Sequence, residues 1–304
     1  MLKKITYQLI VLSMLVIVCS CAKEPIQYED PQKIILSNEN DIKNYITQKG
    51  LVNYERIAKN DYFFYLKKNT TSSDSTQEYD GSTVTISFKV YDLNGKLLDS
   101  TKTNEPYTYV SNKFFVPRIA NLLFDLRKGD KVSILCPYIY MSFDGDITPK
   151  RIEAEILNVQ SEEEAINTYL VRTNNTDMLV SNAGVRYKIT KKLPNAPSLT
   201  TGSSIDYLGE FLRPTQFLTY DYSINQYVYK KTLIFDKNVM RYDPKESLIS
   251  GFTEALNLLK LGEEGTFVIP YSLAYGEKGI SLNDMKTDYT MPPYSTLVFT
   301  IKTY

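Results

Sequence analysis

The chain has 304 residues, long enough for one large domain or two smaller domains with an apolar core each. It contains no histidine, which excludes Ser-His-Asp and Cys-His nucleophiles and histidine-ligated zinc. The 35 Lys and Arg residues are balanced by 35 Asp and Glu residues, so we expect no nucleic-acid partner. The three cysteines, Cys19, Cys21 and Cys136, cannot form a disulfide framework or a cysteine-rich metal site. We therefore expect no metal and no cofactor, with Cys136 as a small buried residue on a strand.

The N-terminus has the features of a bacterial export signal. Two lysines precede an apolar run at residues 9–18, which is shorter than the roughly 20 residues that a membrane-spanning helix needs. The run ends in Val18-Cys19-Ser20-Cys21, which resembles the lipobox of bacterial lipoproteins. We interpret residues 1–20 as a lipoprotein signal peptide and Cys21 as the lipid attachment site. A lipid-anchored protein of the cell envelope, with the outer membrane as its destination, is favoured over an uncleaved membrane anchor.

Beyond the signal peptide the chain repeats itself loosely. Residues 21–38 carry two prolines, several charges and no clear hydrophobic period, and we interpret them as a tether. A short amphipathic helix is predicted around residues 41–46, followed by an apolar strand at 62–68. The same order recurs in a helix at 164–170 and a strand at 185–189. This pattern indicates two units, each entered through a helix.

The repetition is clearest in the second half of each unit. Gly129 and Gly262 each follow an apolar helix pattern, and each is followed by a strand that ends in proline, Pro137 or Pro270. The separation between the two glycines equals that between the two prolines, so this stretch aligns without a gap. Two copies of one domain explain the match. The helix patterns are Ile119, Leu122, Leu123 and Leu126 in the first unit and Phe252, Ala255, Leu256 and Leu259 in the second.

The strand patterns complete the fold-class prediction. Residues 84–90 alternate apolar and polar side chains, which is typical of a strand with one buried face. Several such strands with one short helix predict an α+β fold, in which an antiparallel β-sheet is wrapped on that helix.

Five ordered blocks in the second unit resemble the FKBP-type peptidyl-prolyl cis-trans isomerases. The resemblance covers residues 184–304, which makes this unit an expected isomerase domain. It predicts a degenerate FKBP-like domain with a leading helix at 39–160 and a linker helix at 161–183. The blocks are Leu248-Ile249-Ser250-Gly251-Phe252-Thr253-Glu254-Ala255-Leu256, Lys260-Leu261-Gly262-Glu263, Val268-Ile269-Pro270, Ala274-Tyr275-Gly276 and Met291-Pro292-Pro293-Tyr294-Ser295-Thr296-Leu297-Val298-Phe299.

The resemblance also implies the site. Its catalytic residues would be Tyr207, Asp236, Phe252, Tyr275 and Phe299, and its substrate-binding residues would be Phe235, Leu248, Ile249 and Met291. The chain departs from the family pattern in a tyrosine-rich insertion between Gly209 and Asp236 and in a long loop before Met291. One further wall residue is left open between Val239 and Tyr242.

The implied reaction suits a chain without histidine. Rotation about an X-Pro bond has a barrier of about 18 to 20 kcal/mol, because twisting removes amide resonance, and it needs no nucleophile, acid or metal. The predicted function is therefore a tethered prolyl isomerase that acts on proline-containing segments of exported proteins. The alternatives are a non-catalytic chaperone or binding module that uses the same apolar pocket, and a structural subunit of a surface assembly.

The first unit is expected to keep the fold without the isomerase pocket. Phe88, Asp99 and Tyr107 are acceptable pocket residues. The other expected counterparts are smaller side chains, so a proline ring would find no flat wall. They are Ile119 for Phe252, Ser142 for Tyr275 and Ala154 for Phe299.

Overall fold

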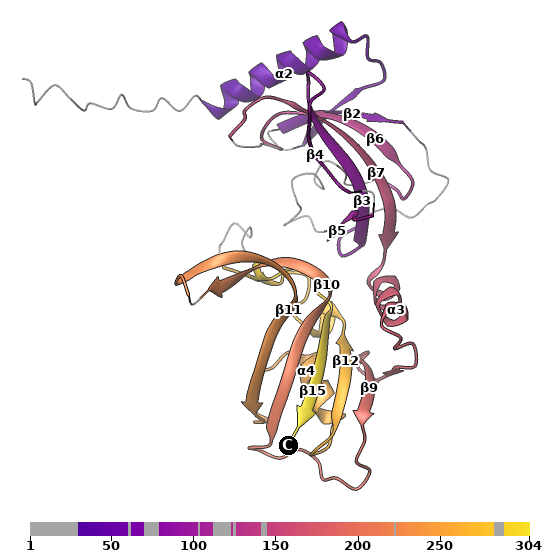
Figure 1. The fold of residues 1–304 in the computed structure, drawn as a ribbon, viewed down its shortest axis with the longest axis vertical. Helices are drawn as coiled ribbons and strands as arrows, with labels where there is room; N and C mark the ends of the chain where they lie inside the picture. The colour runs from indigo at the N-terminus through magenta and orange to yellow at the C-terminus, as the bar shows by residue number, and fades with distance from the viewer. Residues whose placement is uncertain are drawn as a thin grey trace, which may run out of the picture.

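A computed structural model describes most of the chain from residue 30 onward as two units stacked along the long axis of the molecule (Figure 1). The signal peptide, Cys21 and most of the predicted helix at 119–126 lie outside the described residues. Within the described residues, no helix is long and apolar enough to cross a membrane. The described ranges are 30–59, 62–69, 79–102, 104–111, 123, 126–140, 145–221, 223–282 and 289–304.

The first unit is an antiparallel sheet entered through a helix, as predicted. Its strands follow the order β1-β2-β6-β7-β3-β4, and β5 pairs with β3. Phe64, Val84, Ile86 and Ile134 belong to its buried core. The elements are α2 (Pro31–Gln48), β1 (Glu55–Lys59), β2 (Tyr62–Lys68), β3 (Thr83–Asp92), β4 (Leu97–Ser100), β5 (Tyr107–Val110), β6 (Lys131–Cys136) and β7 (Lys150–Gln160).

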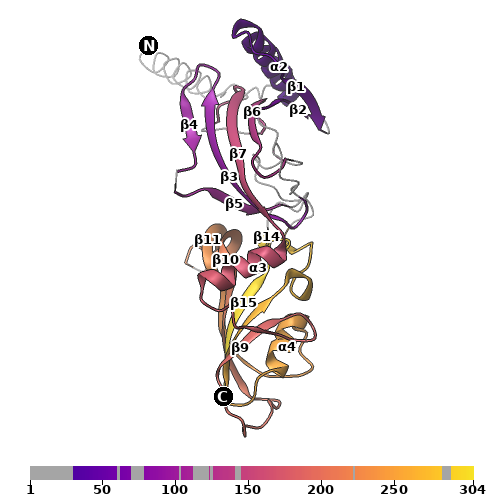
Figure 2. The same ribbon diagram turned by 90° about the vertical axis from the view of Figure 1, so that its right-hand side faces the viewer.

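The second unit is built in the same way. Its main sheet follows the order β11-β10-β15-β12-β9-β8, and α4 packs on it through Phe252, Ala255 and Leu256 (Figure 2). The elements are α3 (Glu162–Arg172), β8 (Leu179–Val180), β9 (Arg186–Lys191), β10 (Ser204–Asp221), β11 (Gln226–Arg241), α4 (Ser250–Asn257), β12 (Glu264–Ile269), the 3-10 turn η2 (Tyr271–Leu273), β13 (Ile280–Ser281), β14 (Tyr289–Met291) and β15 (Leu297–Thr303).

The two main sheets share one strand order. Read from the other edge, the first sheet is β4-β3-β7-β6-β2-β1, and these strands correspond in sequence order to β11-β10-β15-β12-β9-β8. The antiparallel sheets and short helices of the two units confirm the predicted α+β class. The origin of the two units as copies of one domain stays a prediction, which this common order supports.

Helix α2 begins earlier than the sequence analysis expected. The predicted tether extended to residue 38, but residues 31–38 form the first half of α2. Asp30 caps the helix by accepting a hydrogen bond from Gln32 N, and Pro31 occupies a first-turn position, where its missing N–H costs no hydrogen bond. Ile35 packs in one buried cluster with Phe63 of β2 and Leu135 of β6. Asn38 donates to Ile147 O and accepts from Tyr138 N, so the helix continues through the expected tether.

Helix α3 is the predicted connection between the units. Ser161 and Glu164 form a capping box, because each side chain bonds the other residue's backbone N–H. The helix buries Ile166 and Leu170 against Val298 of β15, together with Leu212 of β10. This apolar contact fixes the helix on the second unit.

The tyrosine-rich insertion is a continuation of two core strands. Gly209 of β10 pairs with Asp236 of β11, and beyond this point the same two strands run on to Asp221 and Gln226. The register shifts twice between Gly209 and Thr215, where the hairpin curves sideways across the end of the second unit that faces the first (Figure 1). The insertion is therefore a β-hairpin at the junction of the two units.

Cys136 is a buried strand residue, as predicted. It is fully buried on β6, and burial raises the pKa of its thiol to about 12. The side chain therefore belongs to the core of the first unit and stays protonated at neutral pH.

Candidate functional site

The structure brings the predicted aromatic residues of the second unit together. Phe252 and Phe299 have ring centroids 4.8 Å apart, and Tyr207 lies 5.3 Å from Phe252 and 5.9 Å from Phe299. Phe235 contacts Phe299 edge to face at 5.6 Å. We call Tyr207, Phe235, Phe252 and Phe299 the aromatic pocket, after the pocket that the family resemblance predicts at these residues.

Sheet register places a carboxylate beside this pocket. Gly209 is the neighbour of both Asp236 on β11 and Phe299 on β15, so these two residues flank one point of β10. The hydroxyl of Tyr207 donates a hydrogen bond to Asp236 Oδ2 at 2.7 Å. Burial, followed by this bond and the charge of Asp236, raises the pKa of Tyr207 well above its usual value. Tyr207 is therefore a neutral donor that orients an exposed carboxylate.

Helix α4 carries one of the two most buried of these rings. Phe252 lies in the first turn and, like Phe299, is 4% exposed. The helix can approach the sheet this closely because of Gly251, where a Cβ would lie 2.2 Å from Ile269 Cγ2. Leu248 and Ile249, just before the helix, are partly buried against the same core.

Tyr275 lies on the loop after η2 and is half-buried. Burial, and then the negative charge of Asp236, raises the pKa of its hydroxyl. The structure records no hydrogen bond from this hydroxyl to any described residue, so it is available to a bound molecule. Met291, on β14, is buried in the same core. The nine predicted site residues of the second unit therefore share one core cluster or its edge.

The sequence left one wall residue open between Val239 and Tyr242, and the exposure of the two side chains distinguishes them. Val239 is 62% exposed on β11, so it is not a wall. Tyr242 packs against the core and remains a candidate.

Phe211 and Phe217 are buried aromatic residues outside the predicted site. Phe211 lies 5.1 Å from Phe235 and 5.4 Å from Phe217, and both are buried. They belong to the insertion, which none of the five quoted sequence blocks covers. The period of two along β10 was the available signal, since Tyr207, Gly209 and Phe211 point to the same face.

Register corrects one counterpart in the first unit. Phe267 pairs with Phe299 in the second unit, and Ile134, at the equivalent place on β6, pairs with Ile152. The counterpart of Phe299 is therefore Ile152, and the expected Ala154 is wrong. The error arose because the connection between these two strands differs in length between the units, so counting residues along the chain loses the register.

The same register shows which residues of the first unit correspond to Tyr207 and Asp236. Val90 pairs with both Asp99 and Ile152, as Gly209 pairs with Asp236 and Phe299. Phe88, two residues earlier, thus stands where the second unit has Tyr207. Asp99 therefore has no tyrosine hydroxyl at this position. The other expected counterparts, Ile119 and Ser142, lie outside the described residues.

Comparison with known proteins agrees with this geometry. Residues 213–303 match the family model described as FKBP-type peptidyl-prolyl cis-trans isomerase. This part of the second unit is similar to the FKBP-type peptidyl-prolyl cis-trans isomerases. The match begins within β10 and ends with β15, so it includes eight of the nine predicted site residues and leaves Tyr207 just before it.

Individual relatives cover parts of the chain. An FKBP-type 22 kDa peptidyl-prolyl cis-trans isomerase of Escherichia coli is 38% identical over 73 residues, which is 23% of this chain and 32% of that protein. A "Probable FKBP-type peptidyl-prolyl cis-trans isomerase" of Haemophilus influenzae is 26% identical over 182 residues, or 59% of this chain and 64% of that protein. The crystal structure of FkpA from Escherichia coli aligns at 22% identity with a TM-score of 0.30, covering 47% of this chain and 57% of that chain. The chain thus spans less than two thirds of the length of these relatives.

Proposed function

We propose that the second unit is a peptidyl-prolyl cis-trans isomerase that acts on proline-containing segments of exported proteins. The observation that carries this proposal is the hydrogen bond between Tyr207 and Asp236 at the rim of a pocket whose floor is Phe252. This arrangement offers a flat apolar surface for a proline ring and, beside it, a fixed carboxylate and a free tyrosine hydroxyl.

The chemistry requires only that the pocket favour the twisted amide. Twisting reduces the charge separation of the planar amide, so an apolar, water-poor surface stabilises the twisted form more than the planar form. Each tenfold acceleration requires about 1.4 kcal/mol, so a thousandfold effect requires only about 4 kcal/mol of preferential binding. A pocket without an acid or base catalyst can supply this.

Each residue has a role in this proposal. Phe252 lies under the proline ring, with Phe299 and Phe235 as side walls. Tyr275 donates a hydrogen bond to a substrate carbonyl, and Asp236, held by Tyr207, places its carboxylate near the rotating amide, where the polarity of the bond changes. Leu248, Ile249 and Met291 line the apolar rim that contacts neighbouring substrate side chains.

A protease-coupled assay with X-Pro peptides tests the proposal on the full chain. Phe252→Leu keeps an apolar side chain in the core but removes the flat ring, so turnover should fall about tenfold or more while the chain stays folded. Tyr220→Phe, in the distal hairpin, is the matched control and should leave turnover unchanged. Equal turnover by the chain and its Phe252→Leu variant would reject the pocket as the site.

A non-catalytic chaperone that uses the same pocket is the second candidate. The observation in its favour is that the hairpin carries apolar side chains to the surface, among them Ile224 at 55% exposure and Ile234 at 45% exposure. A chaperone would suppress aggregation of unfolded chains without changing the rate of prolyl isomerisation, so the two activities must be measured separately.

We also propose that a lipid on Cys21 anchors the protein to the outer membrane. The lipobox-like sequence supports this proposal, and several acyl chains on one cysteine would give stable anchoring. Cys21→Ala should release the protein from the membrane fraction, and a variant that stays bound as firmly as the parent protein would contradict the proposal.

The first unit, in this proposal, serves for spacing, dimerisation or client capture. The replacement of Tyr207 and Phe299 by Phe88 and Ile152 at the equivalent register supports the loss of its pocket. Turnover should therefore disappear when only the second pocket is disabled in the full chain. Residual turnover at the parent level would show that the first unit is active.

A further inference from the structure

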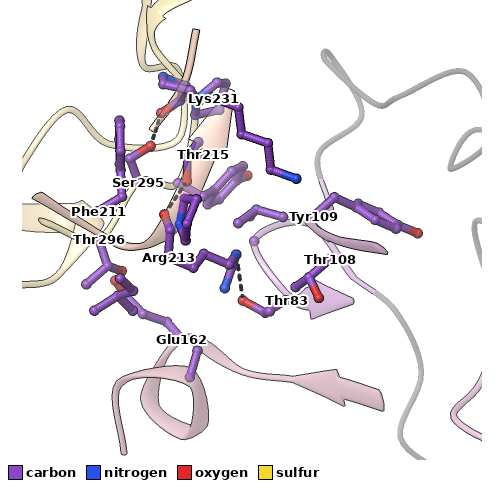
Figure 3. Close-up of a pocket in the computed structure, with 18 of the residues that line it drawn as sticks. Thr83, Thr108, Tyr109, Glu162, Phe211, Arg213, Thr215, Lys231, Ser295 and Thr296 are labelled. Carbon is purple, nitrogen blue, oxygen red and sulfur yellow. Dashed lines mark hydrogen bonds between the residues drawn. The ribbon is translucent and has the colours of Figure 1, made fainter. Parts of the chain in front are cut away.

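A cavity of about 330 Å³ lies between the two units, apart from the aromatic pocket (Figure 3). The first unit contributes β5 and the start of β3, and the second contributes the bend of β10, Lys231 of β11 and the segment 292–296 before β15. Its size is that of a small-molecule or short-peptide site. The aromatic side chains in its wall are Tyr107, Tyr109, Phe211 and Tyr294.

Arg213 is the most distinctive side chain of this cavity. Its guanidinium reaches across from β10 and donates to Thr83 Oγ1 at 3.3 Å, a long bond to a neutral group (Figure 3). No described carboxylate pairs with the guanidinium of Arg213. The charged group that acts on it is a second cation, Arg172. Burial and this second cation lower the pKa of Arg213 to about 10. The guanidinium therefore remains charged at neutral pH and retains donors that Thr83 does not use.

Several hydroxyl groups of the wall have hydrogen-bond partners of their own. Thr108 bonds Thr85, Thr215 donates to the carbonyl of Arg213, and Ser295 donates to the carbonyl of Pro292. Among the described hydroxyls of the wall, that of Thr83 is the one that accepts a hydrogen bond from Arg213.

The charges of the wall favour an anion. The carboxylate of Glu162 accepts hydrogen bonds from Tyr271 N and the hydroxyl of Thr296, so it serves to join α3 to the second unit. Lys231 adds a second positive charge, and no ion pair to a described carboxylate neutralises it. Among the described residues of the wall, two cations and one engaged carboxylate leave free donors and a net positive charge.

We propose that this cavity binds an acidic residue of a polypeptide segment, with apolar neighbours of that residue against the tyrosine and phenylalanine rings. A carboxylate matches the forked donors of Arg213, and the aromatic wall matches apolar side chains. The choice of a polypeptide rests on the proposed function, because Phe211 lines this cavity and also contacts Phe235 of the aromatic pocket at 5.1 Å. A client chain held at one site lies close to the other.

The test compares two peptides without proline that differ only in charge, so that no proline ring enters the aromatic pocket and any apolar binding there is common to both. The probes are acetyl-Ala-Phe-Glu-Leu-Ala-amide and its glutamine counterpart, titrated into the full chain by calorimetry. We expect the glutamate peptide to bind about tenfold more tightly, because a charged hydrogen bond replaces a neutral one. Equal affinities would overturn the proposal.

Variants of the cavity residues test whether the preference for the glutamate peptide arises at this cavity. Arg213→Met and Lys231→Met should each reduce the preference for glutamate, and Arg213→Lys, which keeps the charge, should retain part of it. Lys230→Met is the matched control, since this neighbour on β11 pairs instead with Asp221 and should keep the full preference. A preference that survives both Arg213→Met and Lys231→Met would overturn the assignment to this cavity. Lys231→Met keeps the test valid if Arg213→Met fails to fold.

A third probe tests whether the cavity binds the carboxylate of a polypeptide or that of a small organic acid. 3-Phenylpropionate carries the same charge and an aromatic ring without a peptide backbone, and it should bind more weakly than the glutamate peptide. Binding as tight as that of the peptide would show a site for small acids and would overturn the polypeptide assignment. None of these results depends on isomerase turnover, so the cavity and the aromatic pocket are tested independently.

Discussion

Gly209 lies directly against the ring of Phe235, and a Cβ at this position would lie 2.7 Å from Phe235 Cζ. The same Cβ would lie 3.1 Å from Phe299 Cε1. The absence of a side chain on β10 is therefore what lets two walls of the aromatic pocket close over the sheet.

Gly209→Ala should consequently destabilise the second unit and distort its pocket. Overpacking of a well-packed site costs about 1 to 3 kcal/mol, and displacement of Phe235 should lower isomerase turnover as well. Urea unfolding and turnover of the purified variant measure the two effects. Asp206→Ala, on the opposite face of the same strand, is the control and should change neither by a comparable amount. A fully active Gly209→Ala variant would show that the contact with Phe235 is not required.

Tyr207→Phe should weaken catalysis through Asp236. The variant keeps the ring that contacts Phe252 but removes the hydroxyl that donates to the carboxylate at 2.7 Å. Loss of one hydrogen bond corresponds to about 1 kcal/mol, or several-fold in kcat/KM. Tyr207→Phe combined with Asp236→Ala should cost less than the sum of the single effects, because both changes remove the same interaction. Strict additivity would indicate that the pair does not act together.

Tyr275→Phe should lower turnover several-fold with little change in stability. The hydroxyl has no hydrogen-bond partner among the described residues, so its removal leaves no partner of the folded chain unsatisfied. Its proposed partner is a substrate carbonyl, and one hydrogen bond contributes about 1 kcal/mol. Kinetics and thermal unfolding of the same sample separate the two effects. A drop in stability with unchanged turnover would assign the hydroxyl a structural role instead.

The first unit should lose stability at acidic pH through Asp146. Its carboxylate accepts a hydrogen bond at 2.8 Å from Lys150, whose side chain is fully buried, and this interaction lowers the pKa of Asp146 from 3.8 to about 2. The folded-state pKa is depressed, so the contribution to stability is fully present above about pH 4 and is lost as the pH falls toward about 2.

Urea unfolding over a pH series checks this expectation. Asp146→Asn should be less stable than the parent chain at neutral pH, and the difference should shrink below about pH 4. Asp206→Asn, in the other unit, serves as the control. A difference that stays constant down to pH 2 would contradict the role of ionised Asp146.

The sequence predicted most of what local patterns determine. Alternation at residues 84–90 and the helical spacing of Phe252, Ala255 and Leu256 correspond to β3 and α4, because burial of one face leaves a periodic trace. The ordered family blocks located the residues that the structure gathers around Phe252. These are features that a short segment carries by itself.

The features that escaped prediction depend on contacts between distant segments. The contact of Phe211 with Phe235 arises because an inserted hairpin continues β10 and β11 and bends, which no family block describes. The counterpart of Phe299 is Ile152 and not Ala154, because the pairing of strands sets the register and residue counting does not reveal it. The cavity around Arg213 forms only where the two units meet, so neither unit's sequence pattern contains it.

The most direct test of the central claim is the rate of cis-trans exchange of an X-Pro peptide, measured by NMR at equilibrium with a catalytic amount of the full chain. The same spectra report binding of the peptide, so catalysis and holding are separated in one sample. The account predicts exchange that rises in proportion to protein concentration and falls about tenfold or more in Phe252→Leu, while Tyr220→Phe matches the parent chain. A peptide that binds to the second unit but exchanges at its uncatalysed rate would contradict the account and favour the chaperone.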